Sequence, residues 1–151
     1  MVGQLVYLAG SVPDTGQSTA DLVPSTSPDS DPEMSGEQVI TGPDGSIVLS
    51  PAAAVASLFH DCTPARAQAA VDQLRPWNPV VSTQAVTGAA WRDLPATFVR
   101  CTADRLPELI CNEFLHRSPQ VVEFPTGHCP NWSQPQLVAA LLGAQVEQLA
   151  A

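Results

Sequence analysis

Two strand-like runs in the C-terminal third, each followed by a helix-like run, constrain the fold of this chain most strongly. Residues 96–101 and 121–124 are short apolar runs typical of buried strands, and helices are predicted for residues 107–115 and 135–149. Short connections between alternating strands and helices favour parallel strands within one sheet. The sequence therefore predicts a strand–helix–strand unit and a second helix that covers it.

A third strand is expected near the N-terminus. Residues 5–9 form an apolar run that is bounded by Gly10 and Pro13, and this is the pattern of a short buried strand. Together, the runs predict an α/β fold with three parallel strands and flanking helices.

The segment between the first and second predicted strands lacks this alternation, and we call residues 13–91 the excursion. Its first part, to about Pro43, is rich in Pro, Ser, Asp, Thr and Gly, a composition typical of loops or disorder. Helices are expected to follow Ser50 and Thr63, because each precedes a proline and Ser or Thr before Pro is a helix-start pattern.

Charge and composition exclude several classes of partner. Fifteen acidic residues against six arginines give a formal net charge of −9, and lysine is absent. A negative chain is a poor partner for nucleic acid or for an anionic membrane surface. No apolar run approaches the roughly 18 residues of a membrane helix, and no signal-peptide pattern is visible, so we expect a cytoplasmic protein. The arginine, alanine and proline bias suggests a bacterial genome rich in G and C.

The four cysteines form no C-x-x-C pair and suggest no disulfide framework. A zinc site could be assembled from His60, Cys62, His128 and Cys129, but structural zinc ligands usually occur as closer pairs. We therefore expect free thiols, no bound metal and no cofactor.

Two polar residues follow neighbouring predicted strands at the point where each strand ends. Asp104 comes shortly after residues 96–101, and His128 shortly after residues 121–124. Functional groups gather at the carboxyl ends of parallel strands, and adjacent strands lie about 4.8 Å apart. We expect Asp104 to accept a hydrogen bond from His128, since a carboxylate that orients an imidazole is half of a nucleophilic triad.

Four stretches carry a resemblance to a known family: LVYLAGSVPDTGQSTADL, LFHDCTPARAQAAVDQLRP, WRDLPATFVRCTADR and VVEFPTGHCPNWSQPQLVAALL. In this order the chain resembles the α/β-hydrolase superfamily. The branch it is most similar to is the bacterial esterase-like group related to plant methyl-ester esterases and hydroxynitrile lyases.

The resemblance implies a partial α/β-hydrolase fold, because it covers only the back half of the family's fold. It makes Asp104 the acid and His128 the base of the family's catalytic triad. It also divides the chain, with residues 1–12 and 92–151 in the hydrolase core and the excursion 13–91 as a cap or lid.

The nucleophile of the triad is not found in the sequence. The family carries its serine upstream of the acid and the base, in a G-x-S-x-G turn that directly follows a strand. The nearest string here is GQSTA, with Ser18 at its centre, but no strand precedes it and Ala20 stands in place of the last glycine. We therefore do not expect Ser18 to be a nucleophile. The family's oxyanion-hole loop has no counterpart in the sequence either.

The remaining candidates concern the substrate. We expect Phe59, His60, Trp77 and Trp91 to line a substrate-binding pocket, although the aromatic residues could equally be core and His60 could simply end a helix. Cys129 directly follows His128, where the resemblance leads us to expect lysine in hydroxynitrile lyases. The esterase-like branch therefore fits better than the lyase branch.

Two hypotheses remain open. The first is that the chain is the C-terminal portion of a carboxylic-ester hydrolase that acts on a small-molecule ester, and that it is inactive alone because it lacks the nucleophile. The second is a non-catalytic ligand-binding or assembly module derived from the same fold. In that case the strand at residues 5–9 would have an unpaired edge, available for self-association or for a complementing N-terminal fragment.

Overall fold

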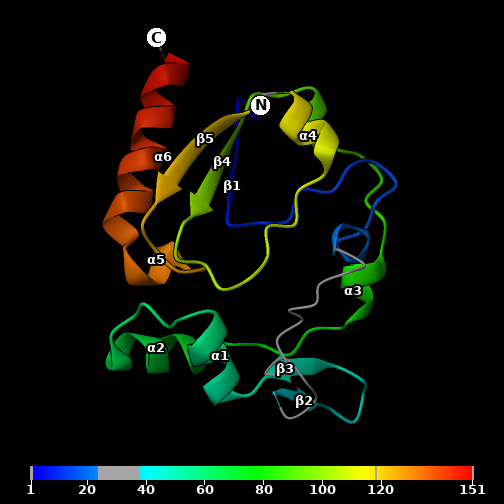
Figure 1. Cartoon of the computed structure of the whole chain (residues 1–151), viewed down its shortest axis with the longest axis vertical. Helices are drawn as coiled ribbons and strands as arrows, with labels where there is room; N and C mark the ends of the chain where they lie inside the picture. The colour runs from blue at the N-terminus through cyan, green and yellow to red at the C-terminus, as the bar shows by residue number, and fades with distance from the viewer. Residues whose placement is uncertain (1, 24–37, 118, 151) are drawn as a thin grey trace.

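A three-stranded parallel sheet forms the centre of the upper part of the molecule (Figure 1). The structure is a computed structural model that describes residues 2–23, 38–117 and 119–150. The strand order β1–β4–β5 confirms the predicted parallel arrangement. The strands are β1 (Leu5–Leu8), β4 (Ala96–Cys101) and β5 (Gln120–Phe124).

The central strand β4 explains why the sheet holds together. Thr97, Phe98 and Val99 are all buried, so β4 is covered on both faces, as expected for a strand in the middle of a parallel sheet. Leu8 pairs with Val99 on one side, and Cys101 pairs with Phe124 on the other.

Helices lie on both faces of this sheet. Phe98 belongs to a buried cluster with Phe114 of α4 (Asn112–His116), so α4 covers the face to which Phe98 points. The helix α6 (Pro135–Ala150) lies along the sheet beside β5 (Figure 1). Gln4 links the sheet to α6, because its amide donates to Thr97 Oγ1 of β4 over 3.1 Å and also to the buried Gln145 of α6.

The predicted helix at residues 107–115 is wrong in its first half, since α4 begins only at Asn112. The residues just before α4 are extended, and they form a parallel bridge with Val12 in the loop after β1. The backbone N–H of Val12 donates to the carbonyl of Leu109 over 2.8 Å, and that of Cys111 donates to the carbonyl of Val12 over 3.0 Å. Val12 is fully buried, so its backbone groups need partners inside the protein. This pairing prevails over local helix propensity.

Residues 39–71 of the excursion form a small layer below the sheet (Figure 1). The predicted helix starts are found: Ser50 Oγ accepts from the N–H of Ala53, and α2 begins after Thr63, whose side chain makes no capping bond. The hairpin of this layer was not predicted, although an Asp-Gly pair in its turn is a hairpin signal. The elements are β2 (Val39–Thr41), β3 (Ile47–Leu49), α1 (Pro51–Ser57) and α2 (Pro64–Val71).

Short helical turns complete the described residues. The turns are η1 (Ala20–Leu22), α3 (Val80–Thr83), η3 (Ala90–Arg92) and α5 (Pro130–Ser133). Within the described ranges, no helix has the length and hydropathy needed to cross a bilayer.

The loop predicted for residues 13–43 falls partly on residues 24–37, which lie outside the described residues. The division of the chain into core and cap remains a prediction.

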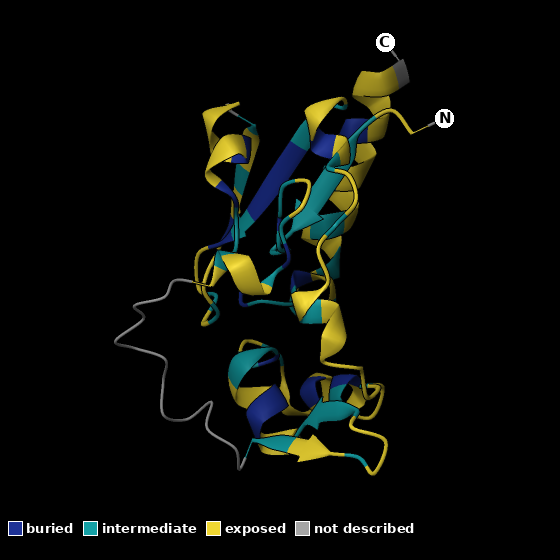
Figure 2. Ribbon diagram, turned by 90° about the vertical axis from the view of Figure 1, so that its right-hand side faces the viewer, coloured by how far each residue is buried: buried dark blue, intermediate teal, exposed yellow. Residues whose placement is uncertain are grey.

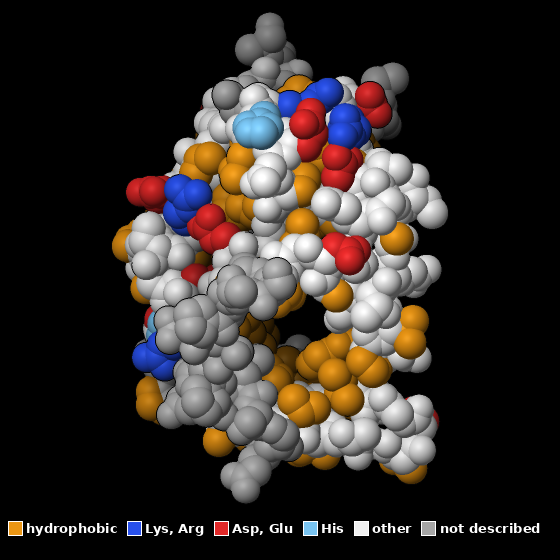
Figure 3. Space-filling view, turned by 45° about the vertical axis from the view of Figure 1, so that its right-hand side comes forward, with side chains coloured by type: hydrophobic (Ala, Val, Ile, Leu, Met, Phe, Trp, Pro, Cys, Tyr) orange, Lys and Arg blue, Asp and Glu red, His pale blue; other side chains and the backbone are white. Residues whose placement is uncertain are grey.

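Buried residues concentrate in two places, one at the sheet and one in the lower layer (Figure 2). On the face drawn in Figure 3, apolar side chains surround a hollow between these two parts. The first cluster consists of Val12, Trp91, Phe98, Cys111 and Phe114, and the second of Ala54, Phe59, Ala67 and Ala70.

Phe114 offers a test of the first cluster, because it is 1% exposed and makes edge-to-face contacts with Tyr7 and Trp91. We expect Phe114→Ala to lower the free energy of unfolding by about 3–5 kcal/mol, as truncation of a buried aromatic leaves a cavity. Urea denaturation followed by circular dichroism measures the loss. The neighbouring Leu115 is 45% exposed, so Leu115→Ala should change stability by only about 0.5 kcal/mol. Equal losses in the two variants would contradict this packing.

Candidate active site

The loops that follow β4 and β5 continue to pair after the strands end. The N–H of Thr102 donates to the carbonyl of Phe124 over 2.9 Å, and that of Ala103 donates to the carbonyl of Thr126 over 3.0 Å. These bonds hold the two loops side by side at the carboxyl edge of the sheet. As a result, the loop residues Asp104 and His128 face each other.

His128 Nδ1 lies 2.8 Å from Asp104 Oδ2. The other carboxylate oxygen, Oδ1, accepts the backbone N–H of Leu106 over 2.9 Å, and the side chains of Asp104 and His128 are 15% and 26% exposed. The carboxylate is therefore fixed at both oxygens, and it orients the imidazole.

Two opposing effects act on the pKa of Asp104. Partial burial raises it, but the hydrogen bonds from His128 and from the backbone of Leu106 outweigh burial, so the pKa lies below its ordinary value of 3.8. Asp104 is consequently ionised near neutral pH. An ionised carboxylate accepts a hydrogen bond from the ring Nδ1 when that nitrogen carries the proton. In the neutral form of the ring, the lone pair is then on Nε2.

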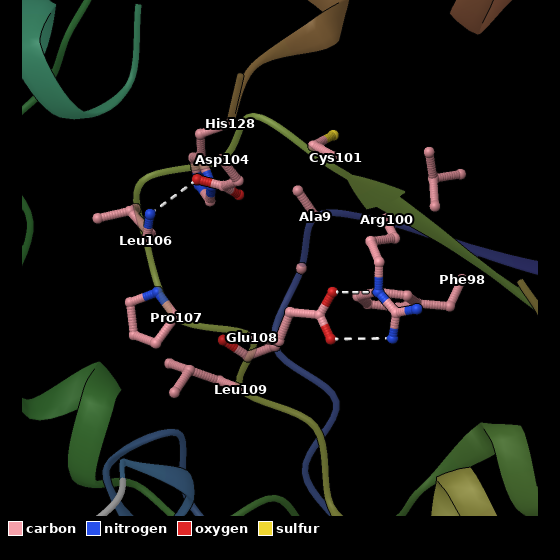
Figure 4. A pocket seen from close by; sticks show the side chains of 13 residues that line it. Ala9, Phe98, Arg100, Cys101, Asp104, Leu106, Pro107, Glu108, Leu109 and His128 are labelled. Carbon is pink, nitrogen blue, oxygen red and sulfur yellow. Dashed lines mark hydrogen bonds and ion pairs between the residues drawn. The ribbon is translucent and has the colours of Figure 1, made fainter. Parts of the chain in front are cut away.

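The Asp104–His128 pair borders a cavity of about 460 Å³ (Figure 4). Another wall comes from the turn after β1, where Ala9 has a left-handed backbone (φ +45°), a conformation that is uncommon for a residue with a side chain. This turn directs Gly10 and Ser11 along the cavity. The lining is mostly apolar, with Phe98, Val99, Leu106, Pro107 and Leu109 among its residues.

An ion pair forms a charged side of the cavity. Arg100 on β4 binds Glu108 through two hydrogen bonds, with Nε–Oε1 at 2.5 Å and Nη2–Oε2 at 3.1 Å (Figure 4). The bonds to Glu108 raise the pKa of Arg100 above its ordinary value. Each charge therefore has a partner, and the cavity wall carries no isolated ion at this point.

Ser18, the centre of the GQSTA string, lies away from this site. It is 3% exposed, its Oγ donates to Asp21 Oδ2 over 2.7 Å, and it is not among the residues that line the cavity. The backbone N–H of Asp21 in turn donates to Ser18 Oγ over 3.3 Å. The serine therefore stabilises a local turn, which agrees with the expectation that it is not a nucleophile.

None of the four expected substrate-binding residues lines the cavity. Phe59 and Trp91 are buried in the second and first clusters, at 3% and 4% exposure. Trp77 is 38% exposed and pairs through its backbone with Ile47. His60 lies against Gly127, next to the His128 loop. Their role in substrate binding remains a prediction.

The cysteines next to the site are poor nucleophiles. Burial raises the pKa of Cys129 to about 12 and raises the pKa of Cys101 as well, so both thiols stay protonated near neutral pH. All four cysteines are free in the structure. Among the residues that the structure describes, no three His, Cys, Asp or Glu side chains are grouped so that they could hold a metal ion.

Sequence reasoning missed several residues of the site. Ser11, Arg100 and Glu108 line the cavity, and Ser11 could have been found because it closely follows a predicted strand at the carboxyl edge. Asp61 also contacts the site's loop, because its carboxylate accepts the N–H of Gly127, directly before His128. No local sequence signal indicates that contact, because the two residues are 66 positions apart.

Comparisons against known proteins agree with the geometry of the sheet. The model of the α/β-hydrolase family matches residues 1–141. The chain belongs to this family. A comparison with curated protein sequences finds no significant match.

Solved structures with the same fold include three enzymes with low sequence identity. A pyrethroid hydrolase from Sphingobium faniae JZ-2 is 14% identical with a TM-score of 0.64, and 95% of this chain is aligned with 60% of that enzyme. Polyneuridine aldehyde esterase is 17% identical with a TM-score of 0.66, and 95% of this chain is aligned with 62% of that enzyme. Tomato methylketone synthase I is 16% identical with a TM-score of 0.65, and 96% of this chain is aligned with 61% of that enzyme. The chain therefore spans about 60% of the length of these structures.

The lowered pKa of Asp104 leads to a pH-dependent prediction. A carboxyl group whose pKa is lower in the folded state stabilises the fold above its unfolded pKa of about 3.8 and loses this contribution as pH falls through the folded pKa. At neutral pH, Asp104→Asn should reduce the free energy of unfolding by about 1.5–3 kcal/mol, the range for hydrogen bonds to a charged group. The gap to the wild type should shrink below about pH 4.

Urea denaturation at a series of pH values measures this gap. Asp93→Asn is the matched control, because Asp93 is exposed and lies outside the cavity. A gap for Asp104→Asn that stays constant from pH 7 to well below pH 4 would argue against an ionised Asp104 in the folded protein.

Proposed function

We propose that this chain supplies the acid and base of a carboxylic-ester hydrolase site of the Ser-His-Asp type. The observation that carries the proposal is the 2.8 Å contact between His128 Nδ1 and Asp104 Oδ2 at the edge of an apolar cavity. In this role Asp104 holds the ring, and His128 Nε2 is left to accept a proton from a nucleophile.

The proposed chemistry requires a serine from outside this chain, because the sequence contains no G-x-S-x-G. His128 would remove the proton of that serine while its oxygen attacks the ester carbonyl. The imidazolium would then donate the proton to the departing alcohol, and water would release the acid in a second cycle of the same steps. Asp104 stabilises the imidazolium in both cycles. The 151-residue chain alone should therefore be inactive.

The nature of the cavity supports a small-molecule ester as the substrate. Ligand sites are typically about 300–1,000 Å³ in volume and mostly apolar, and this cavity of about 460 Å³ is lined largely by apolar residues. Two of the structural neighbours are a pyrethroid hydrolase and an esterase. The excursion would act as the cap over this site.

A second candidate function, a non-catalytic assembly module, is favoured by the position of β1. Within the described ranges β1 pairs with β4 on one side and with no strand on the other. Its four residues are only half-buried, and an open strand edge is a template for pairing with another chain. A complementing fragment or a second copy could occupy this edge.

Ester turnover tests the first proposal. We expect the purified chain to hydrolyse short-chain nitrophenyl esters no faster than background. Mixed with an α/β-hydrolase N-terminal segment that carries G-x-S-x-G, it should gain turnover, and His128→Ala should reduce that turnover by at least about 10³-fold. His116→Ala is the matched control, because His116 is an exposed histidine at the end of α4.

Each result has a defined reading. Turnover by the chain alone that His128→Ala abolishes would reveal an internal nucleophile and contradict the proposed division of the site. Reconstituted turnover that survives His128→Ala would contradict the role of His128 as base. Light scattering on the chain alone tests the assembly module, since a monomer at all concentrations would count against pairing of two β1 edges.

A further inference from the structure

We propose that Asp61, a residue of the excursion, is a positioning residue for His128. It keeps the imidazole of His128 in hydrogen-bonding contact with Asp104. The inference rests on the proposed role of His128 as base. It concerns a contact between segments that are far apart in the sequence.

The contact itself is a short hydrogen bond. The backbone N–H of Gly127 donates to Asp61 Oδ2 over 2.7 Å, and Gly127 directly precedes His128. A bond between a backbone amide and a carboxylate is roughly twice as strong as one between neutral groups. Asp61 itself is exposed, whereas Gly127 is buried. The carboxylate therefore reaches from the surface to a backbone group that has little other access to solvent.

Gly127 is shaped for this close approach. A Cβ atom at this position would lie 2.8 Å from Asp61 Oδ1 and 2.8 Å from His60 Nε2, closer than real Cβ contacts allow. Only glycine lets the His60–Asp61 pair press against the backbone before His128. His60 Nε2 is buried and has no hydrogen-bond partner among the residues that the structure describes, so the close approach is maintained without a bond to that atom.

The same loop is also tied to the sheet and to α2. On the sheet side, Thr126 accepts the N–H of Ala103 over 3.0 Å. Beyond His128, Trp132 packs edge-to-face on Phe59, and its carbonyl accepts from Arg66 Nη1 over 3.1 Å. Among the bonds from the excursion, that of Asp61 is the nearest in sequence to His128, at the preceding residue.

This arrangement gives Asp61 a specific effect on the base. The sheet holds Thr126, but rotation of the backbone at Gly127 would swing the imidazole away from Asp104. The bond from Asp61 restrains that rotation and also satisfies the Gly127 amide. Loss of the bond should therefore loosen the Nδ1–Oδ2 contact and leave Asp104 in place.

The test is nuclear magnetic resonance on the full 151-residue chain with ¹⁵N-labelled histidine. The ring nitrogen shifts report which nitrogen carries the proton, and His128→Ala assigns the signal among the three histidines. In the wild type we expect His128 protonated at Nδ1. In Asp61→Ala we expect a mixture of the two tautomers, and exchange of the Gly127 amide with solvent should be about ten- to a hundredfold faster.

Two variants serve as controls. Asp61→Asn keeps an oxygen that can accept from Gly127, so its tautomer should remain that of the wild type. Asp72→Ala removes a carboxylate just after α2 that accepts a hydrogen bond from Gln68, so it should leave both signals unchanged. An Asp61→Ala variant that is folded and indistinguishable from the wild type in both signals would overturn the proposal.

Wild-type protein provides a measurement that does not depend on the folding of a variant. A scalar coupling across the hydrogen bond should connect the Gly127 amide nitrogen with Asp61 Cγ. Its absence, in a spectrum that shows the couplings between β4 and β5, would overturn the proposal. A His128 ring protonated at Nε2 in the wild type would instead contradict the proposed function, so the two failures are distinguishable.

Discussion

Parallel pairing of β4 with β5 is the interaction on which the site depends. The pairing does not stop at Cys101 and Phe124, because backbone bonds from Thr102 and Ala103 carry it into the loops. Two loops held in this way bring a carboxylate and an imidazole together even though neither is part of a strand. The hydrogen bonds that result lower the pKa of Asp104 despite its partial burial. The electrostatics of the pair therefore follow from the register of the sheet.

The second buried cluster connects the loop of His128 to the rest of the chain. Cys129 and Trp132, which follow His128 closely, pack against Phe59 and the small side chains of α1 and α2. The His128 loop is thus supported by the sheet on one side and by the excursion on the other.

Errors of the sequence reasoning occur where long-range contacts decide the local structure. The expected helix before Asn112 gives way to an extended segment because the buried Val12 needs backbone partners. Trp91, for which the sequence leaves a pocket and the core equally open, lies in the first buried cluster. An aromatic side chain contributes apolar area to a core or to a pocket alike, so composition cannot distinguish the two. The bond from Asp61 to Gly127 is of the same kind, as it joins segments that no local pattern relates.

By itself, the sequence determined the three parallel strands, the helices that begin at Pro51 and Pro64, and the polar residues at the ends of β4 and β5. Each of these depends on local periodicity, capping or the general rule for parallel sheets. Tertiary structure alone decided which residues line the cavity, how Asp61 reaches the loop of His128, and that Ser18 only stabilises a turn. These features depend on contacts between segments that are distant in the sequence. Burial and backbone hydrogen bonding determine those contacts, and they exist only in the folded chain.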